Sequence, residues 1–311
     1  MKTLLQILLV VSAFQGSAGY TSSAHPASGI AVNEQGEVFF IHTGRGLGKI
    51  DQQGNLTYVH SSEGGHWLCL DTTGSFSRTQ PRHFQRITAP GEKPAIIFAD
   101  GGSPIAVLPN GSLYYVSNDD KLTPGGLHLT CNSAAGELSL PSPSLNKATE
   151  RMGITGLAAG PDGHVYVACP NAVFRMNTNG TFATIAASIS LPDCDVDYPD
   201  GNTNMALPAL RGLAADKDGN VFATGTGCHV VLKITPNGKV RTVLTSERPW
   251  SPTGVAVREG DVYVLEYSNA NKGNGRGWFP RVRKLGVDGA ITTLVTLSER
   301  NAPAAGNGES K

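Results

Sequence analysis

The chain has 311 residues, and its 25 Lys and Arg residues balance its 25 Asp and Glu residues, so the formal net charge is zero. This balance provides no long-range field toward a polyanion, which argues against nucleic-acid binding. The 38 Gly and 19 Pro residues, with no sustained helical periodicity beyond the N-terminal segment, favour many short strands joined by turns.

The first predicted element is a cleaved secretory signal peptide over residues 1–19. Lys2 precedes an apolar stretch from Leu4 to Phe14, and small residues follow from Gly16 to Ala18. The stretch is shorter than a membrane-spanning helix requires, and no other segment is apolar enough to span a bilayer. We therefore expect a secreted or periplasmic protein that begins near residue 20.

After this segment a short phrase recurs, in which Gly is followed by Ile, Leu or Val and then Ala. It starts at Gly29, Gly156, Gly212 and Gly254, and weaker copies start near 67 and 104. In most copies, a polar turn that contains Gly leads into an apolar strand, a pattern typical of hairpins. Two further runs, as at 231–234 and 240–244, complete four strands per copy.

Four strands per repeat predict a propeller blade. The expected fold is all-β, a six-bladed β-propeller of four-stranded antiparallel blades that start near 29, 67, 104, 156, 212 and 254. We expect one domain over residues 20–300, followed by a flexible tail over residues 301–311.

Five cysteines are present, and the oxidising environment of an exported protein favours disulfide bonds between them. Cys194 lies in a long insertion before the fifth blade, and Cys228 follows that blade's second strand. Both segments should emerge on one face of the disc, so a Cys194–Cys228 disulfide is the preferred prediction. Cys169, at the equivalent turn of the fourth blade, is the alternative partner, and Cys69 is expected to be buried.

The largest insertions fall in loops that share one face of a propeller, and this loop-rich face is the expected binding face. One insertion carries an acidic run with Asp193, Asp195, Asp197 and Asp200. Alternating carboxylates suit a divalent cation such as calcium. A solvated acidic loop held by Cys194 is the alternative interpretation.

A second candidate site lies in the sixth blade, where Glu266 and Tyr267 end the second strand and Trp278 and Arg281 follow a polar loop. A carboxylate beside aromatic and Arg side chains is typical of a site for a polar ligand. Alternatively, Glu266 forms a structural ion pair with Arg281 or Arg283.

Arg211 precedes the Gly of the fifth blade at the rim of the central channel. It can recognise a carboxylate or phosphate, or it can bond backbone carbonyls at the rim. His229 and His42 are candidate metal ligands or bases, although a lone histidine is often structural.

The repeats resemble NHL repeats, and the chain from residue 20 resembles the group of six-bladed propellers that contains gluconolactonase, regucalcin-like and strictosidine-synthase-like proteins. The resemblance is best at 253–257 and 262–267. It implies a divalent metal in the central channel and lactone hydrolysis. This group's three metal ligands, however, correspond to positions where this chain has Ala27 and Ser28, then Thr155 or Arg211, and then Thr253.

The resulting prediction is an exported propeller that binds a small molecule or a protein through its loop-rich face. The alternative is a gluconolactonase-like hydrolase or lyase, with or without a metal, whose rearranged site is built from Glu266, Arg211, His229 and the acidic loop.

Overall fold

A computed structural model describes the chain over residues 26–61, 64–71, 84–87, 95–100, 103–118, 127–133, 136–140, 153–177, 180–192, 194, 207–268 and 278–298. The predicted signal peptide and the predicted tail lie outside these ranges. In the part described, no helix is long and apolar enough to cross a membrane.

The first three blades follow one another along the chain. Blade 1 consists of β1 (Ile30–Val32), β2 (Val38–His42), β3 (Gly46–Ile50) and β4 (Leu56–His60). Blade 2 consists of β5 (Gly65–Asp71), β6 (Phe84–Arg86) and β7 (Ala95–Asp100). Blade 3 consists of β8 (Ile105–Val107), β9 (Leu113–Asn118), β10 (Leu127–Ser133) and β11 (Gly136–Leu140).

The last three blades are the most regular. Blade 4 consists of β12 (Gly156–Ala159), β13 (Val165–Cys169), β14 (Ala172–Met176) and β15 (Phe182–Ala186). Blade 5 consists of β16 (Leu210–Ala215), β17 (Val221–Gly225), β18 (Val230–Ile234) and β19 (Val240–Thr245), with the short 3-10 helix η1 (Thr226–Cys228) after β17. Blade 6 consists of β20 (Trp250–Arg258), β21 (Asp261–Ser268), β22 (Phe279–Leu285) and β23 (Ile291–Thr296).

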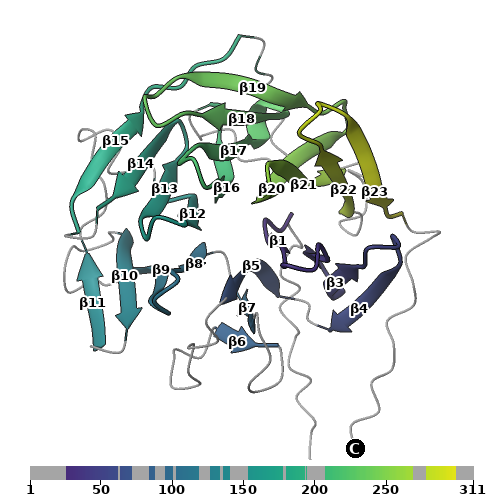
Figure 1. The fold of residues 1–311 in the computed structure, drawn as a ribbon, viewed down its shortest axis with the longest axis horizontal. Coiled ribbons are helices and arrows are strands. Elements are labelled where there is room, and N and C mark those ends of the chain that lie inside the picture. The colour runs from purple at the N-terminus through teal and green to yellow at the C-terminus, as the bar shows by residue number, and fades with distance from the viewer. Residues whose placement is uncertain are drawn as a thin grey trace, which may run out of the picture.

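The six sheets stand around a central axis, with the first strand of each blade innermost (Figure 1). The inner strands β1, β5, β8, β12, β16 and β20 contact one another in this order, and β20 contacts β1. The predicted six-bladed propeller is thus confirmed.

Blade 2 departs from the predicted order. Among the described residues it has three strands, in the spatial order β5-β7-β6, so the middle strand is the last in the chain. Only residues 67–70 were predicted as a strand of this blade. Five of the six residues of β7 are apolar, and its described side chains are buried, which suits a strand that is covered on both faces.

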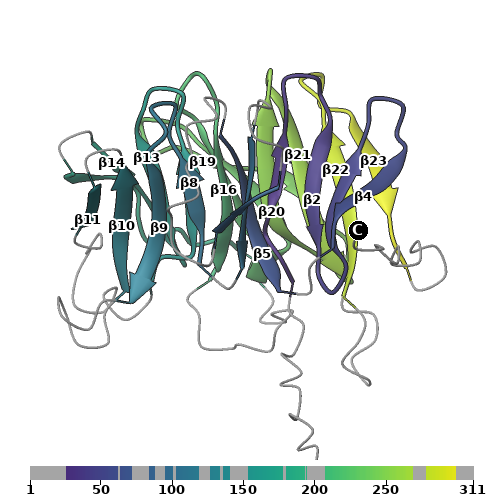
Figure 2. The same ribbon diagram turned by 90° about the horizontal axis from the view of Figure 1, so that it is seen from below.

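The two faces of the ring differ in their connections. Turns such as 33–37, 160–164, 216–220 and 286–290 join first to second or third to fourth strands and lie on one side, here called the turn face (Figure 2). The turns after the second strands and the links between blades lie on the other side, here called the connection face. This separation follows from the up-and-down order of strands within a blade.

The hydrophobic core lies between blades rather than within one central mass. Separate clusters of buried apolar side chains join blades 2 and 3, 3 and 4, 4 and 5, and 5 and 6. One further cluster joins blades 6, 1 and 2, with Phe40, Phe98 and Leu265 in it. The core is therefore continuous around the ring.

The recurring glycine allows successive inner strands to approach closely. A Cβ atom on Gly156 would lie 1.9 Å from the carbonyl oxygen of Arg211, and one on Gly254 would lie 2.3 Å from that of Ser28. A Cβ on Gly212 would lie 2.8 Å from the carbonyl oxygen of Thr253. Real Cβ atoms do not tolerate such contacts, so any larger residue would push neighbouring blades apart.

Ring closure depends on contacts between sheets, because blade 1 is built only from the N-terminal strands and blade 6 only from the C-terminal strands. Thr253 Oγ1 donates to the carbonyl oxygen of Ala27 at 2.6 Å, and Tyr267 Oη donates to that of Ile41 at 2.6 Å. Both donors are fully buried. These bonds join the first and last blades without a shared strand.

We expect Gly254→Ala to lower the free energy of unfolding by about 3 kcal/mol, because the methyl group would force β20 away from β1. Gly289→Ala is the matched control, since a Cβ atom at this position would have no neighbour within 4 Å and only the φ of +83° is unfavourable. The control should lose about 1 kcal/mol. Urea denaturation of both variants measures the difference, and equal losses would contradict the close-approach argument.

His42 ends β2 and is 3% exposed, with Nδ1 at 2.5 Å from Tyr58 Oη. Burial, assisted by the charge of Arg45, lowers the pKa of His42 to about 4. In the unfolded chain the pKa is near the ordinary value of 6.5. Between these two values the unfolded state binds a proton that the folded state does not, so stability falls as the pH falls from 6.5 to 4.

We expect the wild-type protein to lose about 2 kcal/mol more stability than His42→Asn between about pH 7 and pH 4.5. Asparagine keeps a polar atom near the position of Nδ1 but does not titrate. Urea denaturation of both proteins across this pH range provides the measurement. Parallel stability curves for the two proteins would rule out His42 as the titrating group.

Candidate functional site

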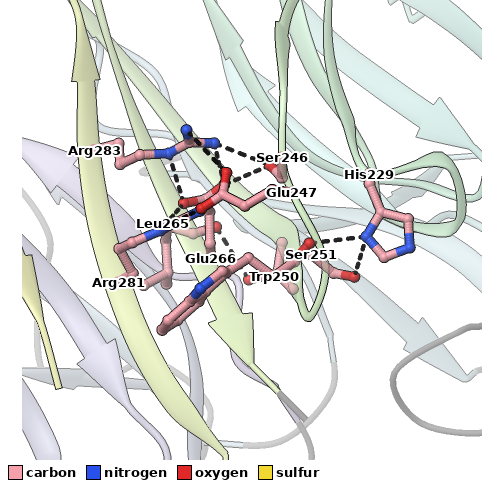
Figure 3. Close-up of polar contacts among 10 residues, drawn as sticks. His229, Ser246, Glu247, Trp250, Ser251, Leu265, Glu266, Arg281 and Arg283 are labelled. Carbon is pink, nitrogen blue, oxygen red and sulfur yellow. Dashed lines mark hydrogen bonds and ion pairs between the residues drawn. The ribbon is translucent and has the colours of Figure 1, made fainter. Parts of the chain in front are cut away.

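A group of charged and aromatic side chains gathers where blade 5 passes into blade 6, on the connection face (Figure 3). We call it the arginine cluster, and its members are Ser246, Glu247, Trp250, Glu266, Arg281 and Arg283. Glu266 lies on β21, both arginines lie on β22, Trp250 begins β20, and the other two residues lie between β19 and β20.

Strand pairing places the charged side chains together. Glu266 lies directly opposite Arg281 in the antiparallel pair of β21 and β22, and Arg283 is two residues further along β22. Residues at i and i+2 of a strand share one face of the sheet, and directly opposite residues share it too. The sequence pattern Arg-x-Arg opposite Glu is therefore sufficient to bring the three groups into contact.

Both carboxylate oxygens of Glu266 are occupied. This fully buried group accepts hydrogen bonds from Arg281 Nε at 2.6 Å and from Arg283 Nε at 2.8 Å. Arg283 Nη2 also donates to it at 2.5 Å, and Ser246 Oγ donates to the same oxygen. The structural ion pair that the sequence offered as the alternative thus forms with both arginines, which leaves Glu266 without a free lone pair for proton transfer.

Glu247 supplies the second negative charge of the cluster. Its side chain is 62% exposed, and it accepts a hydrogen bond from Arg281 Nη1 and lies 3.7 Å from Arg283 Nη1. The hydrogen bond from Arg281 is the main reason that the pKa of Glu247 is lowered. Glu247 therefore stays ionised at neutral pH and covers the outer side of the two guanidinium groups.

One guanidinium nitrogen of Arg281 makes no hydrogen bond to the described residues. Its guanidinium lies over the ring of Trp250, with Cζ 4.4 Å from the ring centroid, and its Nη2 is buried without a hydrogen-bond partner among the described residues. Burial opposes the charge, but the hydrogen bonds to Glu247 and Glu266 outweigh it and raise the pKa of Arg281. A buried guanidinium donor without an acceptor is rare and favours binding of a further anion or water.

His229 lies beside the cluster and does not act as a base toward Ser251. Its Nδ1 lies 2.8 Å from the carbonyl oxygen of Trp250 and 3.0 Å from Ser251 Oγ. Because a carbonyl only accepts, Nδ1 donates in this contact and carries a proton. The Nε2 atom is buried and has no partner in the described part of the chain.

The predicted disulfide is confirmed. Cys194 and Cys228 are bonded, with their Cα atoms 4.4 Å apart, so the alternative pairing with Cys169 is wrong. Cys69, Cys131 and Cys169 are free thiols. No prediction was made for Cys131, which lies buried on β10. The disulfide ends next to His229 and holds the chain after blade 4 against the connection face.

The other predicted site residues do not join the arginine cluster. Successive side chains of a strand point to opposite faces, so Tyr267 points away from Glu266 and is fully buried against blade 1. Its burial raises the pKa of Tyr267 to about 12. Trp278 packs against the apolar cluster of blades 6, 1 and 2. Arg211 Nη2 donates to the carbonyl oxygen of Pro26 at 2.7 Å, which is the rim contact given as its alternative.

The channel rim does not fit the divalent metal that the family resemblance implies. At these positions Thr253 Oγ1 and Arg211 Nη2 donate hydrogen bonds to backbone carbonyl oxygens. The Arg211 side chain also brings a positive charge to the rim. Within the described ranges, no group of three or more His, Cys, Asp or Glu residues is placed to hold a metal ion. The acidic residues Asp193, Asp195, Asp197 and Asp200 lie outside the described residues.

Three members of the cluster, Ser246, Glu247 and Trp250, were not predicted from the sequence. These residues belong to a link between blades, and no motif connects such a link with side chains two strands away. The only available signal was the run Ser246 to Trp250 itself, in which a carboxylate precedes an aromatic residue at a blade boundary.

We expect the double variant Cys194→Ala/Cys228→Ala to lose about 4 kcal/mol of stability, because the disulfide closes a loop with a sequence separation of 34. Thermal melting with and without dithiothreitol measures this loss. The reductant should lower the melting temperature of the wild-type protein and leave that of the double variant unchanged. An equal response of both proteins would contradict the prediction.

The comparisons with known proteins show a similarity of fold alone. No protein-family model matches the chain, and no curated protein matches it. Among solved structures, it is similar to a luciferin-regenerating enzyme, with 13% identity, a TM-score of 0.52, and coverage of 88% of this chain and 93% of that chain.

Two bacterial structures are similar to the same extent. The calcium-binding protein regucalcin from Agrobacterium tumefaciens has 13% identity and a TM-score of 0.52, with coverage of 80% of this chain and 84% of that chain. An inactive H270A virginiamycin B lyase from Staphylococcus aureus, solved with quinupristin, has 16% identity and a TM-score of 0.50, with coverage of 88% and 85%. The chain is thus a six-bladed β-propeller whose structural neighbours include regucalcin and streptogramin-type lyase propellers.

Proposed function

We propose that this chain is an exported ligand-binding propeller that holds a small carboxylate or phosphate at the arginine cluster. The observation that carries the proposal is the charge arrangement. Two guanidinium groups, each less than one-tenth exposed, share one buried carboxylate, and the other negative charge comes from the exposed Glu247.

Glu247 stands where the anionic group of a ligand would bind. It contacts Arg281 Nη1 and lies near Arg283 Nη1, and its exposed side chain can rotate into water without leaving a buried charge of its own. Nη2 of Arg281 is available as a further donor. A planar guanidinium that is already held by Glu266 and Trp250 loses little entropy when it binds an anion.

Export is supported by two features. The Cys194–Cys228 disulfide is typical of an oxidising compartment, and the N-terminal segment has the pattern of a signal peptide. Both features agree with a protein that meets its ligand outside the cytoplasm.

No observation in the described part of the chain supports the alternative function, a hydrolase or lyase. Arg211 is bonded to Pro26, away from Glu266, and the oxygens of Glu266 are already occupied. An assay of lactone hydrolysis with and without a chelator tests this alternative directly, and a chelator-sensitive activity would favour it over the binding function.

The binding test uses inorganic phosphate and benzoate as probes. Calorimetry measures binding, and tryptophan fluorescence, compared with that of Trp250→Phe, reports the change at the cluster. We expect saturable binding that a chelator does not change, because guanidinium groups rather than a metal hold the anion. Glu247→Gln should bind about threefold to tenfold more tightly, since it removes a competing charge of similar shape.

The controls separate the site from general charge effects. Glu259→Gln removes another exposed carboxylate, 74% exposed and on the turn face, and it should leave the affinity unchanged. Arg281→Gln should abolish binding. Equal affinities for wild type and Glu247→Gln, or no saturable binding of either probe, would refute the proposal even if Arg281→Gln fails to fold.

A further inference from the structure

The central channel holds a cavity of about 660 Å³ that contains no residue of the arginine cluster in its lining. All six inner strands line it. The last inner-strand residues of this lining, before the chain enters the turns, are apolar: Val32, Leu70, Val107, Ala159, Ala215 and Val257. Five of these six remain partly exposed, although they lie at the centre of the molecule.

The cavity has the form of a funnel that ends short of the connection face. Its lining contains none of the recurring glycines Gly156, Gly212 and Gly254, where successive inner strands approach most closely. Arg211 and Thr253 add hydrogen bonds across the rim on that side. At the other end the lining reaches the turns of the turn face, at Pro109, Pro161 and 216–218. The funnel therefore opens on the turn face, opposite the arginine cluster.

The mouth carries charged side chains, but each is neutralised by a neighbour. Asp218 pairs with Lys217 at 2.7 Å, Glu259 pairs with Arg258 at 2.9 Å, and Asp216 lies 3.8 Å from Lys233. Among the described residues, the mouth therefore has no excess charge of either sign that would attract a charged ligand. An ion in the apolar funnel would also lose its hydration without a partner.

The wall also offers hydrogen bonds. Each inner strand stands at the end of its sheet, so one edge of its backbone pairs with no strand among the described residues. Six such edges surround the cavity, and they present N–H and C=O groups between the apolar side chains. Small-molecule sites of about 300–1,000 Å³ usually combine an apolar wall with a few polar groups in this way.

We propose that the funnel is a second binding site, for a small, neutral and largely apolar molecule that carries one or a few hydrogen-bonding groups. The site is independent of the arginine cluster, because it lies at the opposite face and uses no residue of that cluster.

The test uses two dyes that share one ring system. N-phenyl-1-naphthylamine is neutral and carries one N–H donor, and 1-anilinonaphthalene-8-sulfonate adds a negative charge. The neutral dye should bind with one-to-one stoichiometry and enhanced fluorescence, and the sulfonate should bind at least about tenfold more weakly. The reverse order of affinity, or no saturable binding of the neutral dye, would overturn the proposal.

Variants locate the site. Ala215→Phe fills the funnel and should weaken binding of the neutral dye at least about tenfold. Thr292→Phe adds the same ring to an exposed position of β23 and should bind as the wild type does. Ala159→Phe, on another wall, replaces Ala215→Phe if that variant does not fold. Unchanged binding in a folded funnel variant would place the dye elsewhere and refute the proposal.

Arg281→Gln separates this site from the arginine cluster. It should leave binding of the neutral dye unchanged, whether or not phosphate binds to the wild-type protein. Loss of dye binding in folded Arg281→Gln would show that the dye occupies the arginine cluster and would contradict a separate funnel site.

Discussion

The close approach of successive inner strands at their glycines is the contact on which the rest of this propeller depends. Gly156, Gly212 and Gly254 each face a backbone carbonyl of the next blade at a distance that excludes a side chain. This spacing sets the width of the ring on the connection face. It also brings β20 against β1, where Thr253 and Tyr267 join the first and last blades without a shared strand.

The same contact gives the two faces different chemistry. On the connection face, where the inner strands approach most closely, Arg211 and Thr253 donate hydrogen bonds to backbone carbonyls. The candidate anion site, the arginine cluster, lies further out, between blades 5 and 6. Toward the turn face the side chains grow larger than Gly while the strands diverge, and an apolar funnel remains.

In the arginine cluster, a buried carboxylate positions two guanidinium groups but is not itself available to a ligand. Glu266 holds both guanidinium groups in the sheet, and its removal would leave two buried cations with the exposed Glu247 as their remaining carboxylate partner among the described residues. Held in this way, Arg281 and Arg283 turn their remaining donors toward Glu247 and the surface. The disulfide bonds Cys194 to Cys228, next to His229, whose ring contacts the carbonyl oxygen of Trp250 in the cluster.

Local pattern predicted the fold, because Gly-containing turns between apolar runs recur in copies of four strands each, and each blade needs only its neighbours. It also placed Glu266 near Arg281 and Cys194 near Cys228, since register and face follow from strand order. Tertiary structure decided what no local pattern encodes. The order of strands in blade 2 and the recruitment of Glu247 and Trp250 depend on contacts between segments that are not neighbours in the chain, and the bond from Arg211 to Pro26 forms only when the ring closes.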